Sequence, residues 1–201
     1  MPRSPMTEAE FEKSRGAILK KAAHIVGQSG VGALSMRRLA AALDLTPGAL
    51  YRYFASKQEL LWAFWEDALV DLRTRFAEID DINEDPVAAI RAMMKTYANF
   101  CLADRDRFRL LFLENDEGIP HVVERDAAAL APYAALNRRM EQAAAQNKIT
   151  TPDTQRSAQM LWGCIHGTVA LALTVNEVDF GDVNLLVEET IDTVLRGLSA
   201  S

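Results

Sequence analysis

Three helix-start signals stand close together in the N-terminal third, and they constrain the fold more than any other feature of the sequence. Ser35, Thr46 and Ser56 each precede a segment with apolar residues at helical spacing. Side chains of this kind accept a hydrogen bond from an unpaired backbone N–H at a helix start. Pro47 adds a favoured first helical residue, and Glu59 completes a capping box with Ser56. This stretch is therefore predicted to form two short helices before a long one begins.

A supporting helix is predicted over residues 13–28, just before the two short helices. Four apolar residues fall on one of its faces: Ile18, Ala22, Ile25 and Val26. The two short helices are separated by a tight turn at Asp44, a residue type that tolerates left-handed backbone better than most. Two short helices with a tight turn and a supporting helix make a helix-turn-helix.

The second short helix is predicted to enter the major groove of DNA. That groove is about 12 Å wide, so the exposed face of the helix needs small or polar side chains. The residues that meet this demand are Thr46, Gly48, Ala49 and Arg52. The opposite face carries Leu50 and Phe54, four residues apart, which we expect to pack against Leu39, Leu43 and Leu45.

Composition predicts that the rest of the chain is helical too. Hydrophobic residues make up 49% of the 201 residues, Gly and Pro are sparse, and alternating β-branched patterns are hard to find. We expect an all-α, two-domain fold with nine helices. No leader and no apolar run near 18 residues is seen, so we expect a cytoplasmic protein without a membrane partner. Cys101 and Cys164 suggest no disulfide framework.

Charge is distributed unevenly along the chain. The overall net charge is −6, but residues 1–57 hold nine basic and four acidic residues, a net charge of +5, which leaves −11 for the remainder. A basic N-terminal part can bind phosphate while an acidic remainder is repelled from DNA.

The segment from Thr46 to Phe54 (TPGALYRYF), followed by Lys57, Glu59, Leu60 and Leu61, resembles the signature of the TetR/AcrR family of transcriptional regulators. The resemblance covers residues 13–62, and Asp44 stands where the family commonly has Gly. Residues 1–12 show no packing stripe and are expected to form a flexible arm. The resemblance implies a helix-turn-helix domain over 13–60 and a ligand-binding and dimerisation domain over 61–201.

The resemblance also assigns roles to individual residues. It implies a base-contacting set of Thr46, Gly48, Ala49, Tyr51 and Arg52 at the start of the recognition helix, which Pro47 opens. It implies phosphate contacts for Tyr53 and Lys57, flanked by Ser35 and Arg37. The alternative for Tyr51 and Tyr53 is that their rings fill the core.

A small-molecule effector site is predicted from large apolar residues on several helices of the second domain. Its candidate residues are Met93, Tyr97, Phe100, Cys101, Phe108, Phe112, Trp162 and His166. Aromatic and Met side chains with few polar groups are typical of apolar ligand pockets. They are equally typical of a core, so both interpretations stay open.

A homodimer is predicted from the apolar stripes of the last two helices. Two such stripes on a small protein suggest a four-helix interface, with packing inside one chain as the alternative. The candidate interface residues are Gly167, Val169, Leu173, Val187, Ile191, Val194 and Leu195. The pattern Trp162-Gly163 and His166-Gly167 resembles a TetR subgroup that carries a Trp and a His-Gly pair (WHG).

No catalytic or metal-binding constellation is found in the sequence, so no enzyme activity, metal or cofactor is expected. The three histidines are far apart, and no Cys/His spacing suits zinc. We expect a repressor that a small apolar or amphipathic ligand releases from a palindromic double-stranded operator. The alternatives are an activator or metabolic sensor of the same type, and a helical carrier or enzyme without DNA binding.

Overall fold

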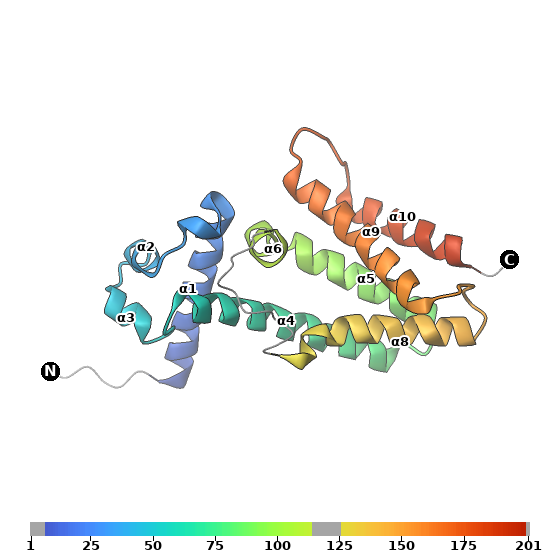
Figure 1. Cartoon of the computed structure of the whole chain (residues 1–201), viewed down its shortest axis with the longest axis horizontal. Coiled ribbons are helices and arrows are strands. Elements are labelled where there is room, and N and C mark those ends of the chain that lie inside the picture. The colour runs from blue at the N-terminus through green and yellow to red at the C-terminus, as the bar shows by residue number, and fades with distance from the viewer. Residues whose placement is uncertain (1–6, 114–125, 200–201) are drawn as a thin grey trace. The chain divides into compact units, whose positions relative to one another are not determined.

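The structure is a computed structural model that describes residues 7–113 and 126–199, without the side chains of residues 65, 68, 110 and 127. Its described part holds nine α-helices and two short 3-10 helices (Figure 1). The α-helices are α1 (Glu8–Ser29), α2 (Met36–Ala42), α3 (Pro47–Tyr51), α4 (Lys57–Ile82), α5 (Pro86–Leu102), α6 (Arg105–Phe112), α8 (Ala131–Ala145), α9 (Thr154–Thr174) and α10 (Val183–Leu198). The 3-10 helices are η1 (Val31–Ala33) and η2 (Ala127–Leu130).

The predicted all-helical fold is confirmed over these residues. The sequence from residue 121 predicts a polar, Ala-rich helix over 121–146, of which residues 121–125 lie outside the described residues. The remainder of that helix is present as η2 and α8. None of the described helices has the length and apolarity needed to cross a membrane.

Contacts divide the chain into two compact units. The first unit comprises residues 1–68 and 105–122, and the second comprises residues 69–104 and 123–201. The division falls inside α4, so this helix begins in one unit and ends in the other. Helix α6 follows α5 in the sequence but packs against α1, and it therefore belongs to the first unit.

Helix α1 begins at Glu8, earlier than its apolar spacing predicts, so residues 8–12 of the predicted arm are helical. The hydroxyl of Thr7 accepts from the backbone N–H of Glu10 at 3.3 Å. The Glu10 carboxylate in turn accepts from the backbone N–H of Thr7 at 2.9 Å. This capping box starts the helix on polar residues that show no packing stripe.

The first unit closes its core between α1, α2 and α3. Leu50 and Phe54 are buried, as predicted for the inner face of the second short helix; of their predicted partners, Leu39 is buried, whereas Leu43 and Leu45 are half-buried. Helix α6 crosses α1 at Gly27, where an added Cβ would lie 1.9 Å from a carboxylate oxygen of Asp106. Arg109 donates to the Gly27 carbonyl at 3.0 Å. This close approach requires glycine at this position of α1.

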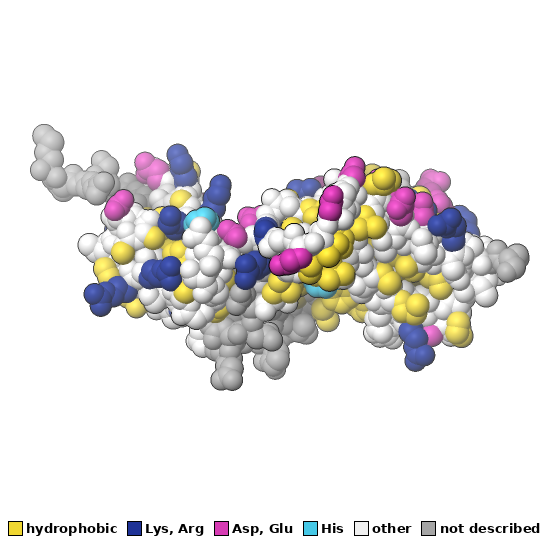
Figure 2. All heavy atoms as spheres, turned by 90° about the horizontal axis from the view of Figure 1, so that it is seen from above, with side chains coloured by type: hydrophobic (Ala, Val, Ile, Leu, Met, Phe, Trp, Pro, Cys, Tyr) yellow, Lys and Arg dark blue, Asp and Glu magenta, His cyan; other side chains and the backbone are white. Residues whose placement is uncertain are grey.

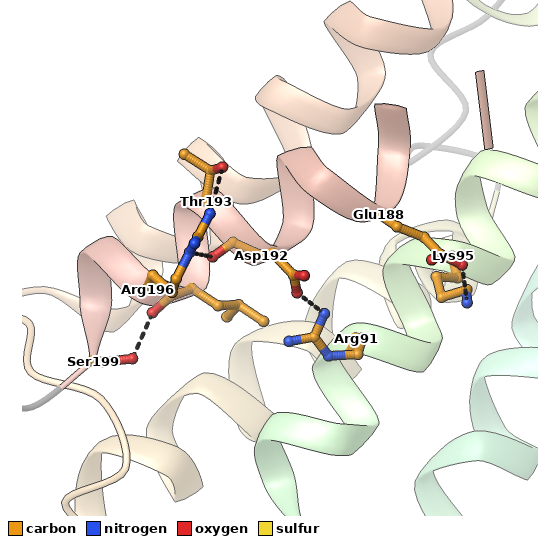
Figure 3. A network of polar contacts seen from close by, with 8 residues as sticks. Arg91, Lys95, Glu188, Asp192, Thr193, Arg196 and Ser199 are labelled. Atoms are coloured by element: carbon orange, nitrogen blue, oxygen red, sulfur yellow. Dashed lines mark hydrogen bonds and ion pairs between the residues drawn. The ribbon is translucent and has the colours of Figure 1, made fainter. Parts of the chain in front are cut away.

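The second unit packs α5, α8, α9 and α10 around one apolar core. Its most deeply buried members include Ile90, Met93, Leu136, Met140, Leu161, Ile165, Val169 and Ile191. Charged side chains join the helices at the surface, where Arg91 and Lys95 of α5 pair with Asp192 and Glu188 of α10 (Figure 3).

The acidic segment after residue 79 is structured. Asp80 lies in α4 and pairs with both Arg138 and Arg139 of α8. Burial opposes the charge of the Asp80 carboxylate, but hydrogen bonds and charge from the two guanidinium groups outweigh it and lower its pKa. Asp85 caps α5 and accepts from Lys148 at 2.6 Å. These carboxylates therefore hold helices together within the second unit.

Candidate nucleic-acid interface and effector site

Side chains cap the starts of α2 and α3, and a tight turn joins the two helices. The Ser35 hydroxyl accepts from the N–H of Arg38 at 3.1 Å, and the Thr46 hydroxyl accepts from the N–H of Ala49 at 3.2 Å. Asp44 adopts a φ of 54°, the left-handed conformation expected for it. The predicted helix-turn-helix is thus confirmed in its caps and in its turn.

Helix α3 presents a small and polar surface. Thr46, Pro47, Gly48 and Arg52 are exposed, and Ala49 is half-buried. A Cβ built on Gly48 would meet no described heavy atom within 4 Å. Because Leu50 faces the core, the opposite side of this short helix is open.

Tyr51 lies on the open side of α3. Its side chain is 49% exposed, so the alternative that its ring fills the core is wrong. The sequence predicts that this helix runs from Pro47 to about Phe54, but it ends at Tyr51. The backbone N–H of Phe54 still donates to the Leu50 carbonyl at 3.2 Å, and this bond holds the following turn close to helical form.

The two residues with predicted phosphate roles are also bound within the first unit. The ammonium of Lys57 donates to the Val31 carbonyl at 3.0 Å. Tyr53 is half-buried, and its ring stacks on Phe11 with centroids 4.8 Å apart. Ser35 and Arg37, by contrast, are exposed. Figure 2 shows Lys and Arg side chains, in dark blue, on the surface of this unit.

The predicted effector residues fall into separate groups. Phe108 and Phe112 belong to α6 in the first unit, with ring centroids 5.2 Å apart. The other six lie in the second unit. Four of these are buried on α5 and two lie on α9: Met93, Tyr97, Phe100, Cys101, and then Trp162 and His166. The eight predicted residues are therefore divided between the two units.

Four rings of the second unit form what we call the aromatic cluster: Tyr97 of α5, Tyr133 of α8, and Trp162 and His166 of α9. The Trp162 ring lies 6.3 Å from Tyr97, 5.8 Å from Tyr133 and 6.5 Å from His166, between centroids. The Tyr97 hydroxyl and Nδ1 of His166 are hydrogen-bonded at 2.7 Å. Three helices thus contribute to one group of rings.

Burial favours the neutral forms of two members of the aromatic cluster, His166 and Tyr97. It lowers the pKa of the His166 imidazole, because a charged ring would lose its hydration. Burial also raises the pKa of the Tyr97 phenol, and the nearby Cys101 adds to this effect. The hydrogen bond between them therefore joins two uncharged groups at neutral pH.

Two polar atoms on α8 are buried without a hydrogen-bond partner among the described residues: the hydroxyl of Tyr133 and Oδ1 of Asn137. They are four residues apart and so lie on one face of the helix. Sequence reasoning missed both, because α8 reads as a polar, Ala-rich helix. A usable signal was their position beside the buried residues Leu136 and Met140.

The predicted dimer residues divide by burial. Val169, Val187, Ile191 and Leu195 are at most 4% exposed in the single chain, so they belong to its own core and leave almost no surface for a second copy. Gly167, Leu173 and Val194 are half-buried. The apolar side chains that α9 and α10 do expose are Met160, Trp162, Leu171 and Leu185.

Among the described residues, no group of three or more His, Cys, Asp and Glu side chains could hold a metal ion. His121 lies outside these residues. The arrangement is therefore a helix-turn-helix with an open recognition helix, joined to a helical unit that carries an aromatic cluster.

Such a pair of units defines a DNA-binding regulator. Residues 18–64 match the family described as "Bacterial regulatory proteins, tetR family", and residues 90–194 match "Tetracyclin repressor-like, C-terminal domain". The second match spans more than half of the chain. The chain therefore belongs to the TetR family of DNA-binding transcriptional regulators, which are not enzymes. None of the curated proteins matches the sequence significantly.

Solved structures share the fold over nearly the whole chain. The TetR family transcriptional regulator PfmR from Thermus thermophilus has 22% identity and a TM-score of 0.76, covering 91% of this chain and 99% of its own. The fatty acid degradation regulator FadR from Bacillus halodurans has 17% identity and a TM-score of 0.75, covering 91% and 98%. The ketosteroid transcriptional regulator KstR2 of Mycobacterium tuberculosis has 16% identity and a TM-score of 0.68, covering 94% and 96%.

Proposed function

We propose that this regulator is a repressor, which binds a palindromic operator as a homodimer and is released by a small apolar or amphipathic ligand. The observation that supports DNA binding is the open side of α3. Gly48 leaves space for a base or backbone to approach, and Tyr51 and Arg52 are exposed beside it. Arg is the residue most often used to read guanine edges in the major groove.

The proposed response to a ligand rests on the second unit. Its aromatic cluster joins three helices, and a ligand that packs there would act on their spacing. A change in the second unit can reach the first along α4, which runs through the unit boundary. A ligand that binds one arrangement of α4 better than another shifts the population of DNA-binding dimers. The WHG subgroup resemblance of Trp162 and His166 points to the same helix, α9.

The proposed homodimer rests on the exposed apolar side chains of α9 and α10. Leu171 and Leu185 are 51% and 53% exposed and flank the connection between the two helices. Figure 2 shows hydrophobic side chains gathered over this part of the second unit. Gly163 and Gly167 have no described heavy atom near an added Cβ, so a second copy could approach there. Leu171→Asp is expected to convert the dimer to a monomer in light scattering.

Electrophoretic shifts with DNA from upstream of the gene test the proposal. Arg52→Ala is expected to weaken specific binding about tenfold or more, and Lys57→Ala to lower the salt slope by about 1. Arg156→Ala is the matched control, because Arg156 is 76% exposed in the second unit. Failure of the wild-type chain to prefer any upstream or palindromic fragment at moderate salt would overturn the proposed operator binding.

In vitro transcription from the same fragment separates repressor from activator. A repressor lowers transcript yield when it is added, whereas an activator raises it. The proposal expects lower yield with the wild-type chain and unchanged yield with Arg52→Ala.

A further inference from the structure

We infer that the effector is a flat apolar molecule with an uncharged hydroxyl group, and that Tyr133 and Asn137 of α8 bind this hydroxyl. The inference rests on the proposed ligand response and names the chemistry of its site. Its starting point is the pair of buried polar atoms without partners among the described residues, the Tyr133 hydroxyl and Oδ1 of Asn137. Native proteins leave few such atoms, because each loses its hydration without regaining a hydrogen bond.

One of the two atoms belongs to a ring of the aromatic cluster, Tyr133, and Asn137 lies one helical turn further along α8. The Tyr133 ring is 5.8 Å from Trp162, which in turn contacts Tyr97 and His166. Trp162 is 38% exposed, so part of this residue is open to contact with another molecule. Rings of this size stabilise a bound apolar or aromatic body by area burial and by offset or edge contacts.

The charge of the surroundings favours a neutral polar group. Within the aromatic cluster, burial keeps the His166 imidazole and the Tyr97 phenol uncharged, and these two groups bind each other. Cations on α5 and α8 are paired with carboxylates elsewhere in the second unit: Arg91 with Asp192, Lys95 with Glu188, and Arg138 and Arg139 with Asp80. Among the described cations of α5 and α8, a ligand carboxylate beside Tyr133 and Asn137 would therefore find none that is not already paired with a carboxylate.

A hydroxyl matches both unpaired atoms. The amide oxygen of Asn137 only accepts, so its partner must donate a proton. The Tyr133 hydroxyl donates or accepts, so its partner can be the lone pairs of the same group. A single ligand hydroxyl can thus donate to Asn137 and accept from Tyr133, which neither a hydrocarbon nor a carboxylate anion can do.

Three probes that share a butyl-substituted benzene ring test the inference: 4-butylphenol, butylbenzene and 4-butylbenzoate. Calorimetry and tryptophan emission on the full chain are expected to show the tightest binding for the phenol. Asn137→Leu and Tyr133→Phe are each expected to lower the affinity for the phenol about tenfold. Both variants are expected to bind butylbenzene with unchanged or higher affinity. Asn99→Leu on α5 is the control, because Asn99 is exposed and is expected to leave all three affinities unchanged.

Several outcomes would overturn the inference. Equal affinity for phenol and hydrocarbon, a preference for the benzoate, or no binding of any probe at millimolar concentration would each do so. Unchanged phenol affinity in both α8 variants would show that water alone serves the two atoms. The same preparations are assayed for operator binding. Operator binding without phenol binding refutes this inference alone, and phenol binding without operator binding refutes the proposed DNA function.

Discussion

The polar side chains of the two units differ in how they are hydrogen-bonded. In the first unit they hold the fold: Ser35 and Thr46 cap helices, Lys57 binds the Val31 carbonyl and Arg109 binds the Gly27 carbonyl. In the second unit the charged groups also pair, but the neutral polar atoms of Tyr133 and Asn137 are buried without partners among the described residues. A unit that binds DNA on its surface can satisfy its interior fully. In the second unit, the proposed ligand would supply the hydrogen bonds that these two atoms lack.

The largest effect is expected from the charged groups of the second unit, which hold its helices together. Asp80→Ala leaves Arg139, which is 8% exposed, without its carboxylate. We expect the free energy of unfolding to fall by about 2–3 kcal/mol. Urea denaturation measures the change. Asp81→Ala is the matched control, since Asp81 is the exposed next residue of α4 and should change little. Equal effects would mean that the Asp80 pairs contribute nothing specific.

The tight packing of the first unit is tested on one helix with two glycines. Gly27→Ala places a Cβ against Asp106 and is expected to destabilise the chain by about 1–3 kcal/mol. Gly16→Ala has open space around it and is expected to stabilise α1 by up to about 1 kcal/mol. Thermal unfolding of both variants measures the contrast. Effects of the same sign would contradict the close approach of α6 to α1.

Removing a polar group should have opposite signs in the two units. Lys57→Met deprives the Val31 carbonyl of a donor and is expected to cost about 1 kcal/mol of stability. Asn137→Leu removes an unpaired buried acceptor and is expected to raise stability by about 1 kcal/mol in the absence of ligand. Urea denaturation without ligand compares them. Destabilisation by Asn137→Leu would show that its amide already serves the fold.

The smallest effect concerns pH. Burial holds the pKa of His166 below its ordinary value of 6.5, so the unfolded chain binds a proton more readily than the folded one. This part of the stability is complete above pH 6.5 and is lost as the pH falls below 6.5. Urea denaturation at pH 7.5 and 5.5 should show a smaller loss for His166→Gln than for wild type. His24→Gln retains His166 and should therefore retain this loss.

The helix-turn-helix could be predicted closely because its determinants are local. A cap joins residues three positions apart, as Ser35 does with Arg38 and Thr46 with Ala49, and a left-handed turn depends on one residue, Asp44. The apolar spacing of Leu50 and Phe54 likewise predicted the buried face of α3 and of the turn that follows it. These interactions form within a few residues, so the sequence by itself determined them.

Tertiary structure decided what covers each apolar or polar side chain. Val169 and Val187 carry the spacing of an interface, but their burial shows that the chain's own helices cover them. The pairing of Tyr97 with His166 joins residues 69 positions apart, and α6 packs on α1 across a similar distance in the chain. Periodicity identifies the face of a helix but not its partner, because partners are chosen by packing across the whole fold.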